Sequence, residues 1–185
     1  RAVIITDFEK TSATTLVEGV MDDEAGGAVA AFRQAVRCDN VDLLNPILMT
    51  GSTVLVDDDL AEEFLKAANN WIKERDLAIT LIDELRGDYH EIIGKGKDWI
   101  PRHYSLMITE FFQSGITKCL IGTRGLLGEG WDASKINVLI DLTTVTTSMS
   151  INQLRGRSIR LDKTWPEKVA NNWDIICLAE EITNG

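Results

Sequence analysis

Short apolar runs alternate with longer amphipathic stretches along this chain. The apolar runs have the length and aliphatic composition of strands that are buried on both faces of a sheet. The clearest of them are "RAVIITDF" (1–8), "TKCLIGT" (117–123) and "INVLIDLT" (136–143). Further strand-like segments are "LAITLIDEL" (77–85), "YHEIIG" (89–94) and "WDIICLA" (173–179), and "PILMTGSTVLV" (46–56) has the form of a hairpin or of two short strands.

Between these runs, apolar residues recur at helical spacing. The clearest case is 57–76, where Leu60, Phe64, Ala68 and Trp71 fall on one face of a helix. The other predicted helices span 24–38, 99–115 and about 148–160. Because strands that alternate with helices favour a parallel sheet covered on both faces, the pattern predicts a single α/β domain over residues 1–185.

The composition excludes several classes of protein. With 44% hydrophobic and 26% charged residues, the chain is ordinary globular protein rather than disordered. No apolar run approaches the ~20 residues of a membrane span, and no signal peptide opens the chain. The three cysteines and two histidines show no disulfide or zinc spacing, which favours a cytoplasmic protein. Because the chain opens on a strand without an initiator Met, we expect it to be a piece of a longer protein.

The charge is unevenly distributed. The formal net charge is −10, but residues 116–163 carry seven Lys or Arg against four acids. Local sign matters more than net charge for binding an anion, so this stretch is a candidate for contact with phosphate. Chance clustering on a surface is the alternative for so small an excess.

Three arginines of this stretch fall in "NQLRGRSIR" (152–160). On a helical wheel, Gln153, Arg157 and Arg160 lie within roughly 60° of one another, whereas Arg155 lies on the opposite side. Gly156 flanks the first group, where a missing side chain lets a backbone or a ligand come close. A glycine inside a helix lowers helix stability by up to ~1 kcal/mol relative to alanine, so a glycine at this position suggests a packing or binding role. A solvated helix face is the alternative interpretation.

A glycine-rich segment, "GTRGLLGEGWD" (122–132), precedes this helix. It follows a predicted buried strand, and ligands of open parallel sheets bind beyond the carboxyl ends of strands. Glycines there let backbone amides approach a phosphate or a sugar. Asp132 could accept ribose hydroxyls or a neighbouring basic side chain. Taken alone, a loop with ordinary turn glycines is at least as good an explanation.

Together the two segments resemble motifs V and VI of superfamily 2 helicases, including the DEAD/DEAH-box type. "GEGWD" is similar to the Gly-x-Asp element, and Gln153-x-x-Gly156-Arg157-x-x-Arg160 matches the Gln-x-x-Gly-Arg-x-x-Arg signature throughout. "RAVIITDF" stands where motif IV opens the second RecA-like domain. The resemblance implies a RecA-like fold of the P-loop NTPase type, a three-layer sandwich with a mainly parallel sheet.

The resemblance also implies roles for individual residues. Arg157 and Arg160 would be catalytic arginine fingers that reach ATP on a preceding, N-terminal RecA-like domain of the same protein. ATP-binding roles would fall to Gln153, Gly156, Gly130 and Asp132, and nucleic-acid binding to Thr123 and Arg124. The chain would thus be the C-terminal domain of an ATP-dependent helicase or translocase acting on DNA or RNA, with ATP and Mg²⁺ held mainly by the other domain.

The remaining sequence lacks the other half of an ATPase site. There is no GxxxxGK[ST] motif, and "IIGKGKDW" (92–99) does not supply one. Asp83 and Glu84 in "TLIDEL" only superficially resemble a Walker B strand. We therefore expect the chain alone neither to hydrolyse ATP nor to unwind nucleic acid. Residues 11–56 exceed what a minimal domain of this kind needs, so they are interpreted as a possible insertion.

Two other classes remain open. The chain could be a degenerate RecA-like scaffold or interaction module without ATPase function, although the complete Gln153–Arg160 signature argues against it. It could also be an unrelated nucleotide-binding α/β enzyme with its glycine loop at 122–130. That class predicts measurable mononucleotide affinity for the chain itself.

Overall fold

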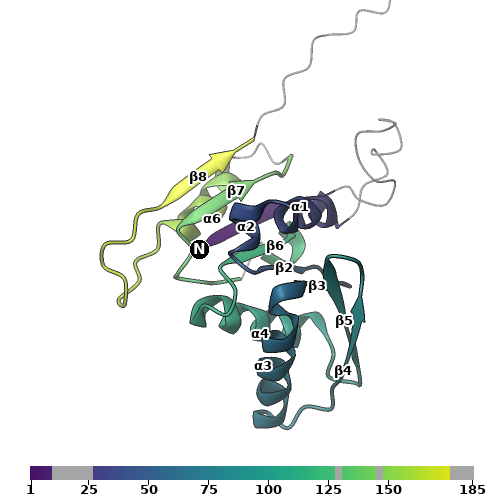
Figure 1. Cartoon of the computed structure of the whole chain (residues 1–185). Coiled ribbons are helices and arrows are strands. Elements are labelled where there is room, and N and C mark those ends of the chain that lie inside the picture. Colours follow the sequence, from purple (N-terminus) through teal and green to yellow (C-terminus); the bar gives the residue numbers. More distant parts are fainter. Residues whose placement is uncertain (10–26, 128–130, 145–147, 176–185) are drawn as a thin grey trace, which may run out of the picture.

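The computed structural model describes residues 1–9, 27–127, 131–144 and 148–175. In these residues the chain forms one eight-stranded sheet with the order β4-β5-β3-β2-β6-β1-β7-β8 (Figure 1). The strands are β1 (Ala2–Thr6), β2 (Pro46–Met49), β3 (Val54–Asp57), β4 (Thr80–Leu85), β5 (Tyr89–Lys95), β6 (Cys119–Thr123), β7 (Val138–Asp141) and β8 (Asn171–Asp174). The helices are α1 (Gly27–Val36), α2 (Asp39–Asp42), the 3-10 turn η2 (Asp58–Leu60), α3 (Ala61–Glu74), α4 (Pro101–Ser114), α5 (Arg124–Leu127) and α6 (Ser148–Ser158).

Strands β2, β6, β1, β7 and β8 pair in parallel and form one part of the sheet. β1 lies in the middle, where Ile4 is opposite Ile121 of β6 and Ile140 of β7. Strand β2 is buried at every position, and so are the first four residues of β6. Burial on both faces explains why these strands read as continuous apolar runs. The parallel pairing also collects their carboxyl ends at one edge of the sheet.

The rest of the sheet is antiparallel. β2 and β3 form a hairpin in which Met49 is opposite Val54, and β5 and β4 extend the sheet from β3. Because β3 runs against β2, its carboxyl end lies at the edge where the parallel strands begin. In this part of the sheet, β3 is buried at every position, whereas β4 has no buried residue.

Helices cover both faces of the sheet, and the alternation of side chains along β6 shows how. Leu120 belongs to the same core cluster as Phe64 of α3 and Phe112 of α4. The next residue, Ile121, belongs to a second cluster with Phe32 of α1. Successive side chains of a strand point to opposite faces, so α1 and α3/α4 lie on opposite sides (Figure 1). The result is an α/β arrangement of three layers.

The ends of α4 follow the rules for helix termini. Pro101 is in the first turn, where its missing N–H costs nothing. Gly115 ends the helix in the left-handed conformation, with φ 101°, and its backbone N–H donates to the Phe111 carbonyl. The sequence prediction of a helix ending at Gly115 is therefore confirmed.

Most of the predicted elements are present, and the final strand differs in its bounds. The structure confirms the α/β class, the mainly parallel sheet and the hairpin at 46–56. The final strand, however, spans Asn171–Asp174 instead of 173–179, and all four of its residues are exposed. Residues 176–179 of the predicted strand lie outside the described part of the chain.

Residues 27–56, which belong to the range interpreted as a possible insertion (11–56), form part of the sheet and its core. β2 pairs directly with β6 and is fully buried, and α1 packs against β1, β2 and β6. These elements are integral to the sheet and its core instead of decorating it. Of the predicted range, 11–26 lies outside the described residues.

In the described part of the chain, no helix combines the length and apolar character needed to cross a membrane.

We predict that Ile121→Ala lowers the free energy of unfolding by about 2 to 5 kcal/mol, because it opens a cavity at a fully buried position of β6. Ile159→Ala is the matched control, since that side chain is 63% exposed and its truncation should change stability by less than ~0.5 kcal/mol. Denaturant unfolding of both variants measures the difference. Equal effects would contradict the placement of β6 in the core.

Candidate functional site

One group of polar residues lies at the sheet edge where the parallel strands end. Thr123 ends β6, Arg124 begins α5, Asp7 directly follows β1, and Thr144 lies beyond β7. The backbone N–H and the Oγ1 hydroxyl of Thr144 both donate to Asp7 Oδ2, each at 2.7 Å. Arg124 Nε lies 3.7 Å from Asp7 Oδ1. Asp7 therefore ties the end of β6 to the segment after β7.

Arg124 is the charged residue of this group that is most accessible to a ligand. Its side chain is 48% exposed, whereas that of Asp7 is 12% exposed. A loose ion pair with a half-exposed arginine contributes little to stability, so the guanidinium can exchange Asp7 for a phosphate at small cost. Thr123 beside it is half-buried.

A second group surrounds the last turn of α6, and its centre is Arg157. The side chain is buried, and Nη1 donates to the carbonyl of Leu127 at 2.8 Å and to that of Trp131 at 2.6 Å. These two carbonyls precede and follow residues 128–130, so one guanidinium contacts the glycine-rich segment at two points. Burial lowers the pKa of Arg157, the nearby charge of Arg160 lowers it further, and Asp132 raises it. An arginine side chain nevertheless stays charged, because its ordinary pKa is far above neutral.

Arg160 stands in a different environment from Arg157. It lies two residues beyond the end of α6 and forms an ion pair with Asp132, with the two side chains 48% and 62% exposed. The sequence argument that Asp132 can accept a neighbouring basic side chain is confirmed. An exposed pair of this kind contributes between zero and about 1 kcal/mol, so Arg160 can leave Asp132 for a stronger anion.

The remaining predicted residues of the signature lie along α6 or beyond the described residues. Gln153 is exposed, and Gly156 is half-buried. A Cβ atom built on Gly156 would meet nothing within 4 Å, so no described part of the chain uses the space that this glycine leaves. Gly130 lies outside the described residues.

The helical wheel predicted one face for Gln153, Arg157 and Arg160, but the structure gives these side chains different surroundings. The carbonyls of Leu127 and Trp131 lie against the last turn only, so Arg157 is buried while Gln153, one turn earlier, is exposed. The helix ends at Ser158, which leaves Arg160 outside its geometry. A shared face on the wheel therefore does not give Arg157 and Arg160 the same exposure.

Arg155, which the wheel places on the opposite side of the helix, makes an ion pair within the chain. Its Nη2 donates to the carboxylate of Asp174 at the end of β8, which joins α6 to the edge strand of the sheet. Arg124, Arg155 and Arg160 thus each pair with an acid of the chain. The excess positive charge of 116–163 is largely compensated locally, which the sequence count did not reveal.

Trp131 fixes the glycine-rich segment from its other side. Its indole Nε1 donates to Thr109 Oγ1 of α4 at 2.7 Å, and the ring packs against the main core. The segment is therefore held between α4 and α6. Trp131 thus supplies the contact of this segment to α4.

Sequence reasoning missed a third group, around Glu9. The carboxylate of Glu9 accepts hydrogen bonds from Ser52 Oγ and Thr53 Oγ1, each at 2.7 Å, and from Thr50 Oγ1. Tyr104 on α4 donates its hydroxyl to the Thr50 carbonyl at 2.7 Å. The signal available in the sequence was the position of these residues after strands. Asp7 and Glu9 lie within three residues of the end of β1, and "TGST" (50–53) follows β2.

A cavity of about 740 Å³ lies beside the first polar group and has a mainly apolar lining. Ile4, Ala31 and Ile140 are among its walls, and Asp7 and Thr144 lie at its polar side. It does not include the arginines of α6. Its lining is therefore unsuited to holding a phosphate.

Comparison of the chain with protein-family models, with curated proteins and with solved structures gave no match.

We predict that Arg157→Ala destabilises the purified chain by about 2 to 4 kcal/mol, because it leaves two carbonyls without their charged donor. Arg160→Ala is the matched control and should cost less than about 1 kcal/mol. Denaturant unfolding distinguishes the two variants. If both changed stability equally, Arg157 would not hold the glycine-rich segment as described.

Proposed function

We propose that this chain is the second RecA-like domain of an ATP-dependent nucleic-acid helicase or translocase. The observation that carries the proposal is the contact between its two sequence motifs. The signature helix α6 and the glycine-rich segment are joined by the two hydrogen bonds from Arg157 to the Leu127 and Trp131 carbonyls. A motor needs such a connection, because movement at the ATP-facing helix must reach the segment that follows β6.

The sheet supports the same proposal. In the order β2-β6-β1-β7-β8, the strand of "RAVIITDF" lies between the strands that lead into the glycine-rich segment and toward α6. The three sequence motifs thus come from neighbouring strands of one parallel sheet. Thr123 and Arg124 at its carboxyl edge would contact the nucleic-acid backbone.

The ATP-facing residues fit half of a nucleotide site. Arg160 is exposed and its carboxylate partner is exposed too, so it can turn to the oxygens of a phosphoryl group, which a guanidinium binds through fork-shaped donors. Gln153 is exposed on the preceding turn. Together with Gly156, Gly130 and Asp132 they would face ATP and Mg²⁺ bound mainly by an N-terminal RecA-like domain of the same protein. DNA or RNA would be the track.

Within this proposal, the two arginines have different roles. Arg160 is the finger that the structure leaves accessible. Arg157 can reach a nucleotide only by giving up the carbonyls of the glycine-rich segment, so it is suited to report nucleotide binding to that segment. The buried contacts of Arg157 also favour the competing scaffold function, in which the helix and the loop are merely packed together.

We predict that Arg160→Ala in the full-length protein reduces nucleic-acid-stimulated ATP turnover by about 10³-fold, as expected for loss of an arginine finger. Arg102→Ala, at an exposed arginine in the first turn of α4, is the matched control and should retain turnover. Because Arg160 contributes little to folding, the loss cannot be assigned to instability. Unchanged turnover in Arg160→Ala would favour the scaffold function.

We also predict that the purified chain of residues 1–185 hydrolyses no ATP and binds ATP too weakly to detect by calorimetry, because it contains no GxxxxGK[ST] motif. Titration with ATP and Mg²⁺ tests this directly. Micromolar affinity would instead indicate a self-contained nucleotide-binding enzyme. Appreciable turnover would contradict the division of the ATP site between two domains.

A further inference from the structure

Asp57, at the carboxyl end of β3, is a fully buried acid without a donor. The residue is 0% exposed, and neither of its carboxylate oxygens has a hydrogen-bond partner among the described residues. Burial of an unpaired carboxylate is costly, so such groups are ordinarily paired with a cation or hydrogen-bonded. Asp57 therefore requires an explanation.

Helix capping does not explain Asp57. The residue precedes η2 in the N-cap position, with φ −53° and ψ 143°, but its side chain makes no capping hydrogen bond. An aspartate selected for capping would accept a backbone N–H of the first turn. The neighbouring Asp58 accepts the Asp59 N–H at 3.0 Å, so Asp58 has a partner that Asp57 lacks.

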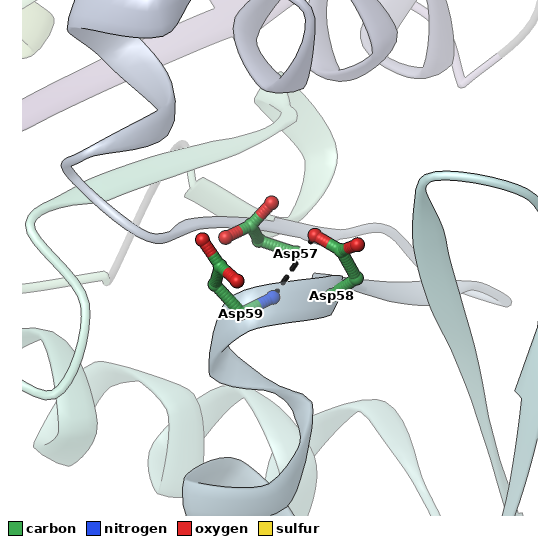
Figure 2. Close-up of side chains that lie close together, drawn as sticks. All are labelled: Asp57, Asp58 and Asp59. Atoms are coloured by element: carbon green, nitrogen blue, oxygen red, sulfur yellow. Dashed lines mark hydrogen bonds between the residues drawn. The ribbon is translucent and has the colours of Figure 1, made fainter.

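The surroundings of Asp57 add negative charge. One carboxylate oxygen each from Asp57, Asp58 and Asp59 lies within 4.8 Å of the others, and Figure 2 shows the three side chains around the start of η2. The carboxyl of Asp42, at the end of α2, also faces Asp57. The pKa of Asp57 is raised to about 7, mainly by burial and then, in decreasing order, by the carboxyl of Asp42 and the charges of Asp58 and Asp59. The described charges acting on Asp57 are thus all acidic.

Two arrangements can relieve this repulsion. A hydrogen bond between Asp57 and Asp42 needs a shared proton, because two ionised carboxylates have no donor between them. A divalent cation among the oxygens would offset the repulsion between these acids without a shared proton. The second arrangement also accounts for the oxygens of Asp58 and Asp59 that converge with those of Asp57.

We propose that Asp57, Asp58 and Asp59, together with Asp42, bind one hard divalent cation of the Ca²⁺ or Mg²⁺ type. The ligand set consists of carboxylate oxygens without imidazole or thiolate, which is the chemistry that these cations prefer. Ca²⁺ tolerates irregular geometry and several carboxylates, and Mg²⁺ would keep part of its water shell. The bound cation would join α2 to the start of α3.

This cation site is separate from the candidate site of the proposed function. β3 is antiparallel to β2, so Asp57 lies at the sheet edge opposite to Thr123 and Arg124. In the sheet, β2, β6 and β1 separate β3 from β7, which leads to α6. The cation is thus distinct from the Mg²⁺ that would accompany ATP, and its test does not rest on the proposed function.

The test measures thermal unfolding of the purified chain after removal of metals with EDTA, without nucleotide or nucleic acid. We expect CaCl₂ or MgCl₂ at about 100 times the dissociation constant to raise Tm by ~5 °C or more, relative to KCl of equal ionic strength. Calorimetric titration should give one cation per chain. No rise in Tm with either cation up to millimolar concentration would overturn the proposal.

Variants connect the response to these acids. Asp57→Asn and Asp59→Asn should each abolish most of the rise in Tm, and circular dichroism checks that both fold. Because Asp59 is exposed, its variant keeps the test valid even if Asp57→Asn fails to fold. Glu63→Gln removes an exposed acid from the first turn of α3 and should leave the rise intact. An equal rise in all three variants would overturn the assignment.

The shared-proton arrangement predicts a dependence of stability on pH and no rise in Tm with CaCl₂ or MgCl₂. The folded-state pKa of Asp57 lies above its ordinary value, so its burial destabilises the chain above pH 7, and stability recovers as the pH falls from about 7 toward 4. A chain that shows this pH dependence and no response to either cation would contain a proton between Asp57 and Asp42, and the proposal would be wrong.

Discussion

The parallel pairing of β1 with β6 on one side and β7 on the other is the constraint on which the rest of the structure depends. With Ile4 between Ile121 and Ile140, the three strands are in register and share one carboxyl edge. That register brings Asp7 together with Arg124 and Thr144, which both lie more than 100 residues after it in the chain. It also fixes where the glycine-rich segment begins and where the connection to α6 starts. Any function of this chain that uses those segments therefore rests on a buried, apolar sheet centre.

Arg157 is the second constraint, because its side chain links α6 to the glycine-rich segment. A buried guanidinium can satisfy several carbonyls at once, whereas a neutral donor of similar size cannot. Here it holds the carbonyls on both sides of 128–130, while Trp131 attaches the same segment to α4. The segment is thus restrained by polar contacts to two helices and by the packing of Leu127 and Trp131 against the main core. The hydrogen bonds of Arg157 can be exchanged for others, which is what the proposed coupling between nucleotide and nucleic acid requires.

The opposite edge of the sheet shows a different use of charge. Around the glycine-rich segment, each arginine has an acid or carbonyls as its partner, so the charges are satisfied within the chain. Around Asp57, three further acids act on its carboxyl, and no basic residue among the described residues is seen to do so. The arginines near the glycine-rich segment can exchange their partners for an external anion, whereas the acids around Asp57 lack a positive partner. This difference is why the two regions lead to separate proposals, one about an anion from outside the chain and one about a cation.

The sequence by itself determined the elements, the α/β class and the identity of the signature residues. Apolar runs such as "TKCLIGT" and the left-handed Gly115 encode local structure through burial and backbone conformation, which a pattern records directly. Only the tertiary structure decided which strands are neighbours, that 27–56 is integral to the sheet, that Arg157 is buried while Arg160 is exposed, and that Asp42 meets Asp57. A helical wheel gives the direction of a side chain along one helix. The wheel cannot show which segment packs against that side chain, because the contact is made by residues that are distant in the sequence.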